Sequence, residues 1–98
     1  MKISQAMEIF MDFQRVNSEE KTIKNYRLFL TKFNDYFGDW DIYQITSENI
    51  LNFLAQNGAE QKQATKRFKY ILLKSFFNFI KNNIDDNFIN PSDTPVLK

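Results

Sequence analysis

The chain has 98 residues, of which 43% are hydrophobic and 26% charged, and its net charge is +1. This length suits one domain with one core, and eleven Phe residues supply apolar volume for it. The absence of Cys and His excludes disulfides, thiolate metal sites and the commonest general base. No apolar run approaches the roughly 20 residues of a membrane helix. We therefore expect a cytoplasmic protein with no cofactor, bound metal or membrane contact.

The first predicted helix covers residues 3–16, with Ser4 as its N-cap. Its buried stripe is predicted to consist of Met7, Phe10, Met11 and Gln14, widened by Ile9, Phe13 and Val16. The second predicted helix covers residues 19–37, capped by Ser18 or Thr22 and ended by Gly38. Its apolar side is predicted to hold Ile23, Tyr26, Phe29, Leu30, Phe33, Tyr36 and Phe37. Both helices are therefore expected to be amphipathic.

A connector and a short third helix follow. In residues 38–47, the apolar side chains Trp40, Ile42 and Ile45 are expected to be buried, because three exposed apolar groups would be unusual in so short a loop. Thr46 or Ser47 is expected to cap a helix over residues 48–56. Its buried side is predicted to hold Ile50, Leu51, Phe53 and Leu54.

The fourth predicted helix lies within residues 61–81, with Thr65 as a candidate N-cap. On a helix that turns about 100° per residue, Phe68 groups with Ile71, Leu72, Ser75 and Phe79 as the predicted core stripe. A second apolar stripe consists of Leu73, Phe76, Phe77 and Ile80. After this helix, Phe88 and Ile89 are candidates to return to the core, and residues 92–98 read as a linker. No segment alternates as a strand should, so the sequence predicts an all-α domain, a small four-helix bundle.

Charge is segregated along the chain. Residues 35–60 hold five acidic groups and no basic group, whereas residues 61–81 hold six basic groups and no acidic group. A solvated helix face explains such a pattern, and so does a surface that binds phosphate. The carboxylates Asp39, Asp41, Asp85 and Asp86 are interpreted as turn residues and not as catalytic pairs.

A candidate DNA-binding surface remains on the second and fourth helices. Lys and Arg supply charge to phosphates, Thr donates to phosphate oxygens, and Asn or Gln can read adenine. The candidate residues are Lys24, Asn25, Arg27, Thr31, Lys62, Gln63, Thr65, Lys66, Arg67, Lys69, Tyr70 and Lys74.

The order of these pieces resembles the N-terminal core-binding (SAM-like) domain of tyrosine recombinases, the phage integrase family. The resemblance runs from about Ile3 to Pro91. The motifs that carry it are the sequences of residues 10–13 (FMDF), 22–26 (TIKNY), 41–46 (DIYQIT), 65–67 (TKR), 75–79 (SFFNF) and 90–91 (NP), with Leu30, Phe33, Ile50, Phe53 and Leu54 between them. Each motif is degenerate, and their order and spacing give the specificity.

The resemblance implies a domain, residues 1–91, that grips duplex recombination-site DNA through its second and fourth helices. It adds Thr22 to the DNA-binding residues of the second helix. It also implies that residues 92–98 begin the linker to a catalytic domain, which this chain lacks. The chain would then be no enzyme, its parent would be a DNA strand-exchange enzyme, and other recombinase protomers on DNA would be partners of an otherwise monomeric domain.

An alternative from another class is a helical protein–protein interaction module with no DNA role. Its support is the second apolar stripe of the fourth helix, which exceeds what one core side needs.

Overall fold

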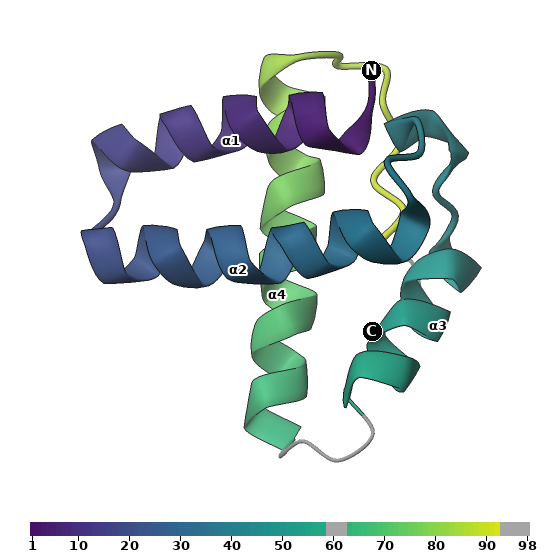
Figure 1. Ribbon diagram of the computed structural model, residues 1–98. Coiled ribbons are helices and arrows are strands. Elements are labelled where there is room, and N and C mark those ends of the chain that lie inside the picture. The colour runs from purple at the N-terminus through teal and green to yellow at the C-terminus, as the bar shows by residue number, and fades with distance from the viewer. Residues whose placement is uncertain (59–62, 93–98) are drawn as a thin grey trace. The chain divides into compact units, whose positions relative to one another are not determined.

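The computed structural model describes residues 1–58 and 63–92. For residues 57, 58 and 63–66 it describes the backbone but not the side chains. Its elements are α1 (Ile3–Asn17), α2 (Glu20–Phe37), the short 3₁₀ helix η1 (Ile42–Gln44), α3 (Ser47–Gly58) and α4 (Gln63–Asn83) (Figure 1). The described residues contain no strand, and their only β contact is an isolated bridge between Lys2 and Asp41. The predicted all-α class with four helices is confirmed. The chain forms two compact units, of which the first is Met1–Gln44 and the second begins at Ile45.

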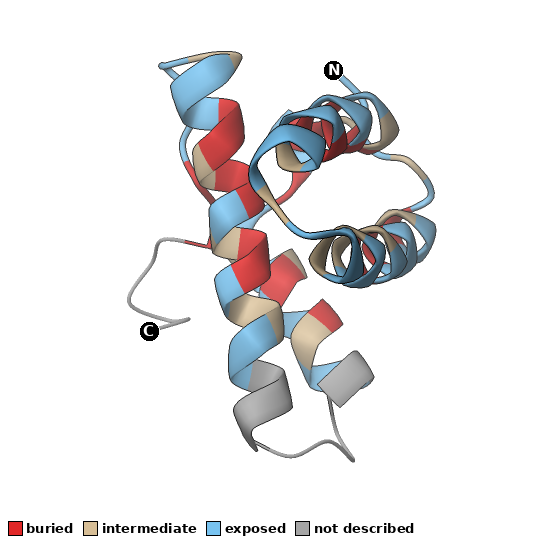
Figure 2. Cartoon of the chain, turned by 90° about the vertical axis from the view of Figure 1, so that its left-hand side faces the viewer, coloured by how far each residue is buried: buried red, intermediate tan, exposed pale blue. Residues whose placement is uncertain are grey.

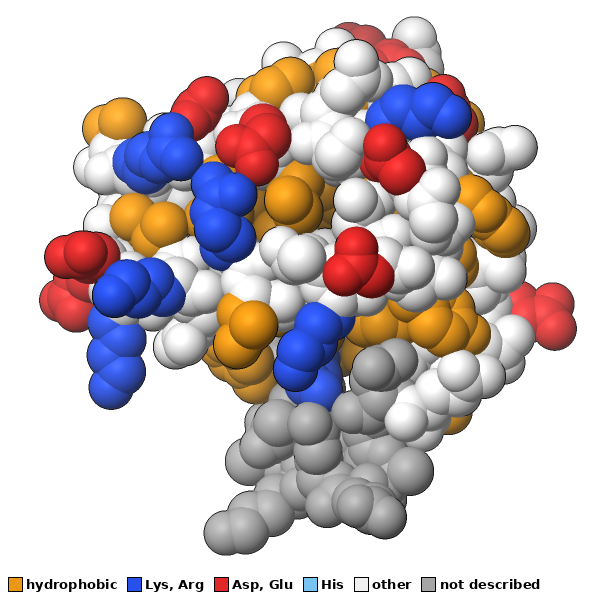
Figure 3. All heavy atoms as spheres, in the orientation of Figure 1, with side chains coloured by type: hydrophobic (Ala, Val, Ile, Leu, Met, Phe, Trp, Pro, Cys, Tyr) orange, Lys and Arg blue, Asp and Glu red, His pale blue; other side chains and the backbone are white. Residues whose placement is uncertain are grey.

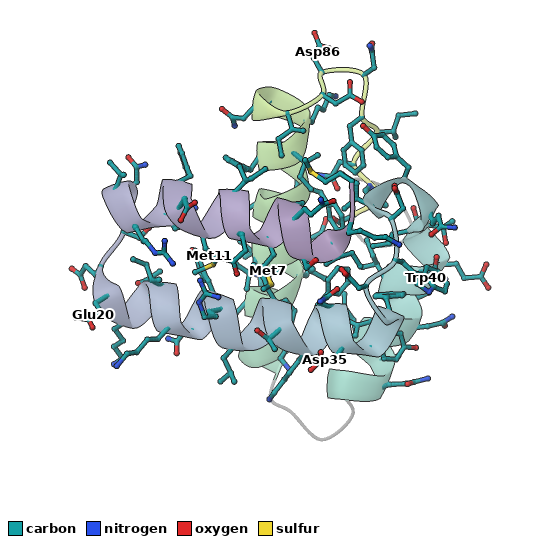
Figure 4. The ribbon with its side chains drawn as sticks, turned by 45° about the horizontal axis from the view of Figure 1, so that its top comes forward. Met7, Met11, Glu20, Asp35, Trp40 and Asp86 are labelled. Atoms are coloured by element: carbon teal, nitrogen blue, oxygen red, sulfur yellow. The ribbon has the colours of Figure 1, made fainter. Side chains whose placement is uncertain are left out.

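In the first unit, α1 and α2 lie side by side and run in opposite directions (Figure 1). Apolar residues three and four positions apart give each helix one buried side. Met7 and Met11 of α1 lie between the two helices (Figure 4). The ring of Phe10 stacks on Tyr26 of α2, with 6.0 Å between the ring centroids. The complete buried set of the two helices is Ile3, Ala6, Met7, Phe10, Met11, Phe29, Leu30, Phe33 and Phe37.

The buried side of α1 is narrower than predicted. Ile9, Phe13 and Val16 are 41%, 45% and 84% exposed, so they do not widen the buried stripe. They lie roughly 90–150° round the helix from the middle of the buried arc that runs from Ala6 through Phe10 to Met11, and the neighbouring α2 covers only part of the circumference of α1. A helix that packs on one side therefore leaves these apolar residues in solvent.

The start of α1 differs from the prediction. Ser4 is not the N-cap, because the helix already begins at Ile3 and Lys2 occupies the capping position. Ser4 lies in the first turn, where its N–H and its hydroxyl donate to the carboxylate of Asp39 at 2.9 and 3.0 Å. The carboxylate of Asp39, in the connector, thus accepts a hydrogen bond from an N–H in the first turn of the helix. At other helix starts a capping side chain accepts this bond.

The C-terminal end of α2 agrees with the prediction, and its N-terminal end does not. Neither Ser18 nor Thr22 caps its start, since Glu19 holds the capping position without a side-chain hydrogen bond. At the other end, Gly38 has φ 66° and ψ 39°, the left-handed conformation that glycine adopts without steric cost. Its N–H returns to the carbonyl groups of Asn34 and Asp35, as the sequence predicts for a helix stop.

The connector buries two of its three apolar residues. Ile42 and Ile45 are 0% and 5% exposed, as predicted. Trp40 is 42% exposed, which corrects the prediction that it is buried. One side of its indole contacts Phe37, with 5.3 Å between ring centroids, and a ring of this size needs a larger pocket than one contact provides.

In the second unit, α3 begins with a reciprocal cap. The N–H of Asn49 donates to Thr46 Oγ1 at 3.2 Å, and the N–H of Thr46 donates to Asn49 Oδ1 at 2.9 Å. This confirms Thr46 as the cap. Ile50 and Phe53 are buried, whereas Leu51 is 41% exposed and does not belong to the buried side as predicted.

The core side of α4 is rotated from its predicted position. Phe68 and Ile71 are 47% and 51% exposed and Ser75 is also exposed, so three of the five predicted stripe residues face solvent. The second apolar stripe provides the core side instead, because Leu73, Phe76, Phe77 and Ile80 are each 0% exposed. Figure 2 shows the buried residues along one side of α4 and exposed residues along the opposite side.

Two further corrections concern the ends of the second unit. The helix α4 begins at Gln63, so Thr65 lies inside it and is not its N-cap. Past α4, Phe88 is buried as predicted and stacks on Phe77 with 5.9 Å between ring centroids. Ile89 is 85% exposed and does not return to the core.

Candidate nucleic-acid interface

The predicted DNA-binding residues lie on α2 in the first unit and on α4 in the second. Each helix is therefore considered as a separate face. Lys62 lies outside the described residues, and so do the side chains of Gln63, Thr65 and Lys66, although these three belong to α4. The residues whose surroundings are described are Thr22, Lys24, Asn25, Arg27, Arg67, Lys69, Tyr70 and Lys74.

The solvent side of α2 carries more basic residues than the prediction named. Lys24 and Asn25 are exposed as a contact with DNA requires, while Thr22 is half-buried. Three exposed residues on the same side were missed as site residues: Lys21, Leu28 and Lys32. The helical angle finds them, since Lys21, Lys24, Leu28 and Lys32 fall within an arc of about 80°. We call Lys21, Lys24, Leu28, Thr31 and Lys32 the outer face of α2.

Arg27 does not belong to that outer face. It is half-buried at the edge of α2, and its guanidinium donates to both carboxylate oxygens of Glu8 on α1, at 3.0 and 3.4 Å. The hydrogen bond from Arg27 lowers the pKa of Glu8, and the same bond raises the pKa of Arg27. The pair therefore links the two helices of the first unit. A phosphate that binds Arg27 has to compete with Glu8 for the guanidinium.

We expect the variant Glu8→Gln to lose less than about 1 kcal/mol of stability at neutral pH, because both side chains remain in contact with water, which screens the pair. Since pairing depresses the folded-state pKa of Glu8, its contribution is present above the pKa of the unfolded chain and is lost as the pH falls through the folded-state pKa. Urea unfolding of both proteins across the acid range measures this difference. The two stabilities should converge at low pH, and a gap that stays constant would contradict the assignment.

On α4, the predicted residues differ in their exposure and in their hydrogen bonds. Arg67 is exposed, whereas Lys69, Tyr70 and Lys74 are half-buried. The hydroxyl of Tyr70 donates to the backbone carbonyl of Ser92 at 3.3 Å. Tyr70 is thus tied to the segment that follows α4, and its hydroxyl is directed at that segment. Arg67 has the exposure that a phosphate contact needs.

The segment after α4 is held against the helix by one buried amide. Asn90 donates from Nδ2 to the carbonyl of Lys74 at 3.3 Å and to Asn78 Oδ1 at 2.9 Å. Its Oδ1 accepts the N–H of Ser92 at 2.8 Å and the Ser92 hydroxyl at 2.9 Å. The hydroxyl of Ser47 donates to the carbonyl of Pro91 at 2.8 Å. We call this network the Asn90 clamp, and it fixes residues 90–92 to α4 and to the start of α3.

The carboxylates of the connector have structural partners. Asp39 accepts from Ser4, and Asp41 accepts from the Tyr43 N–H and from the amino group of Met1. The Tyr43 N–H is the main cause of the lowered pKa of Asp41, followed by the amino group. Among residues 1–58 and 63–92, no group of three or more acidic residues could hold a metal ion, and no helix is long and apolar enough to cross a membrane.

Figure 3 shows Lys and Arg side chains along α1 and α2, interspersed with acidic and hydrophobic ones.

Residues 10–83 match the family model described as the phage integrase N-terminal SAM-like domain. The match covers all four helices from Phe10 onward, which agrees with the resemblance found in the order of the motifs. Comparisons with curated proteins and with solved structures found no match.

Proposed function

Since the chain belongs to the family of phage integrase N-terminal SAM-like domains, we propose that it is the part of a tyrosine recombinase that grips duplex recombination-site DNA. The observation that carries the proposal is the outer face of α2, where three lysines are exposed and no acidic residue occurs between Lys21 and Asn34. Lysines so placed attract the phosphate backbone. The DNA would serve site-specific recombination or integration, as in the family to which the chain belongs.

The proposed contacts divide by chemistry. Lys24 on α2 and Arg67 on α4 are exposed and suit phosphates. Asn25 is exposed and suits a base edge or a phosphate oxygen. Arg27 contributes only when it exchanges Glu8 for a phosphate. Tyr70 contributes by the face of its ring, because its hydroxyl is bound to Ser92.

The chemistry of strand exchange is assigned to a catalytic domain elsewhere in the parent protein. In this proposal residues 1–91 bind DNA and residues 92–98 begin the linker. Other protomers bound to the same site are the second class of partner. The net charge of only +1 supports modest affinity that depends on salt.

The test is binding of the 98-residue chain to a labelled duplex as a function of salt. We expect Lys24→Glu and Arg67→Glu each to weaken binding, and together to remove it at moderate salt. If each residue neutralises one phosphate, each variant reduces the slope of log affinity against log salt by about 0.9. Fluorescence anisotropy measures both quantities, and circular dichroism checks the helical content.

Lys81→Glu is the matched control, because Lys81 is an exposed lysine at the other end of α4 and is not a proposed contact. The same change of charge there should alter affinity much less. If the Lys24 and Arg67 variants bind as the unaltered chain does, or if Lys81→Glu weakens binding equally, the proposed interface is wrong.

A helical protein–protein interaction module remains the second candidate. The observation that favours it in the structure differs from the one that favoured it in the sequence. The stripe that favoured it, Leu73, Phe76, Phe77 and Ile80, is fully buried and so does not face a partner protein in solution. Phe68 and Ile71 are the exposed apolar pair on α4. Self-association that depends on concentration, is lost on Phe68→Ala and occurs without any DNA binding would favour this candidate.

A further inference from the structure

Leu28 occupies the middle of the outer face of α2. It is 61% exposed, and the core side of the helix is already formed by Phe29, Leu30 and Phe33. A single exposed leucine is ordinary on a protein surface. Its neighbours distinguish it: Lys24 and Asn25 lie four and three positions before it, and Thr31 and Lys32 lie three and four positions after it, all exposed. Lys21 lies one further turn before Lys24 on the same side of the helix. Two cationic groups, one amide and one hydroxyl therefore border this apolar side chain.

The charges of α2 indicate which occupant fits this face. Glu20 and Asp35 lie near opposite ends of the helix (Figure 4), and between them the helix contains no acidic residue. An occupant that complements this face is therefore anionic beside Leu28 and presents an apolar group to it. Duplex DNA meets both conditions, because its major groove has phosphates on both sides and the 5-methyl group of thymine on its floor. The groove is about 12 Å wide and admits an α-helix.

We propose that Leu28 is a specificity residue that contacts a thymine methyl group in the major groove while Lys21, Lys24 and Lys32 hold the flanking phosphates. The inference rests on the proposed function and adds to it a base preference and two phosphate contacts, Lys21 and Lys32. The hydroxyl of Thr31 lies one turn beyond Leu28, where it can donate to or accept from the neighbouring base edge.

The experiment isolates one methyl group. The 98-residue chain first selects its preferred duplex from a pool of randomised sequences. That duplex is then resynthesised with each thymine replaced in turn by deoxyuridine, which removes only the 5-methyl group. One replacement should weaken binding by the unaltered chain about fourfold, the equivalent of one buried methyl group. The variant Leu28→Ala should bind the thymine and the uracil duplex equally.

Val16→Ala is the matched control, because Val16 is an exposed apolar residue of the same unit, on α1. It should retain the fourfold preference. The inference is overturned, with the proposed function intact, if the chain binds DNA but no thymine methyl distinguishes the unaltered chain from Leu28→Ala. If no duplex is bound at low salt, the proposed function itself fails. Binding of an acidic helical peptide to this face in place of DNA would overturn both.

Discussion

Replacing Phe77 with alanine is expected to lower the free energy of unfolding by about 3–5 kcal/mol, the usual cost of removing a buried aromatic ring. Phe77 is 0% exposed, and its ring contacts two other aromatic rings of the second unit. The ring centroids of Phe76 and Phe88 are 5.2 and 5.9 Å away. Alanine would leave a cavity beside Phe88, which holds the chain after α4. Urea unfolding followed by circular dichroism measures the loss.

Phe68→Ala provides the matched control, since it makes the same chemical change in the same helix at a residue that is 47% exposed. We expect a loss below about 1 kcal/mol there, because a surface substitution creates no cavity. Equal losses in the two variants would contradict the observed direction of the core side of α4. A larger loss from Phe68→Ala would restore the core stripe predicted from the sequence.

The error in α4 has a definite cause. Helical periodicity gives the angles between residues reliably. The predicted core stripe is nevertheless divided in the structure, because Leu72 and Phe79 are buried with the second stripe while Phe68 and Ile71 face solvent. Periodicity does not give the absolute rotation of a helix that carries two apolar stripes. The prediction took Phe68 as its reference, although Phe76 and Phe77 are the fully buried aromatic residues of α4. Which stripe is buried depends on what the rest of the fold places beside the helix.

Helix starts show the same limit on a smaller scale. The cap at Thr46 could be predicted, because both partners of the reciprocal hydrogen bonds lie within three residues. The start of α1 could not be predicted, because its extra acceptor is Asp39, which lies 35 residues away from Ser4. Local partners can be read from the sequence, and distant partners require the fold.

The candidate site likewise has features that the sequence shows and a contact that only the fold shows. The basic character of α2 is plain from the sequence, and so is the absence of acidic residues around Arg67. The engagement of Arg27 by Glu8 is not, since these residues are 19 positions apart on different helices. That pairing moves the expected centre of the α2 surface from Arg27 to Leu28 and its lysines.

Replacing Asn90 with alanine is expected to lower the free energy of unfolding by about 2–3 kcal/mol. Asn90 is 6% exposed and makes all four side-chain hydrogen bonds at the centre of the Asn90 clamp. Alanine makes none of them, so the N–H of Ser92 loses its partner at a buried position and Asn78 Oδ1 loses its partner at a half-buried one. A lost partner at a buried polar group costs about 1–3 kcal/mol before water enters. Urea unfolding measures the total, and hydrogen exchange at the Ser92 amide reports the local release.

The clamp also gives a physical reason for the asparagine at position 90. The amide of Asn90 bonds to α4 through Nδ2 and to Ser92 through Oδ1, a combination that neither aspartate nor alanine reproduces. Asn87→Ala is the matched control, because Asn87 is an exposed asparagine of the same segment. It should change stability by less than about 0.5 kcal/mol and leave exchange at Ser92 unaltered. Faster exchange at Ser92 in Asn90→Ala alone would establish that one side chain fixes the direction in which the chain leaves α4, whereas equal exchange in both variants would show that the clamp does not hold this segment.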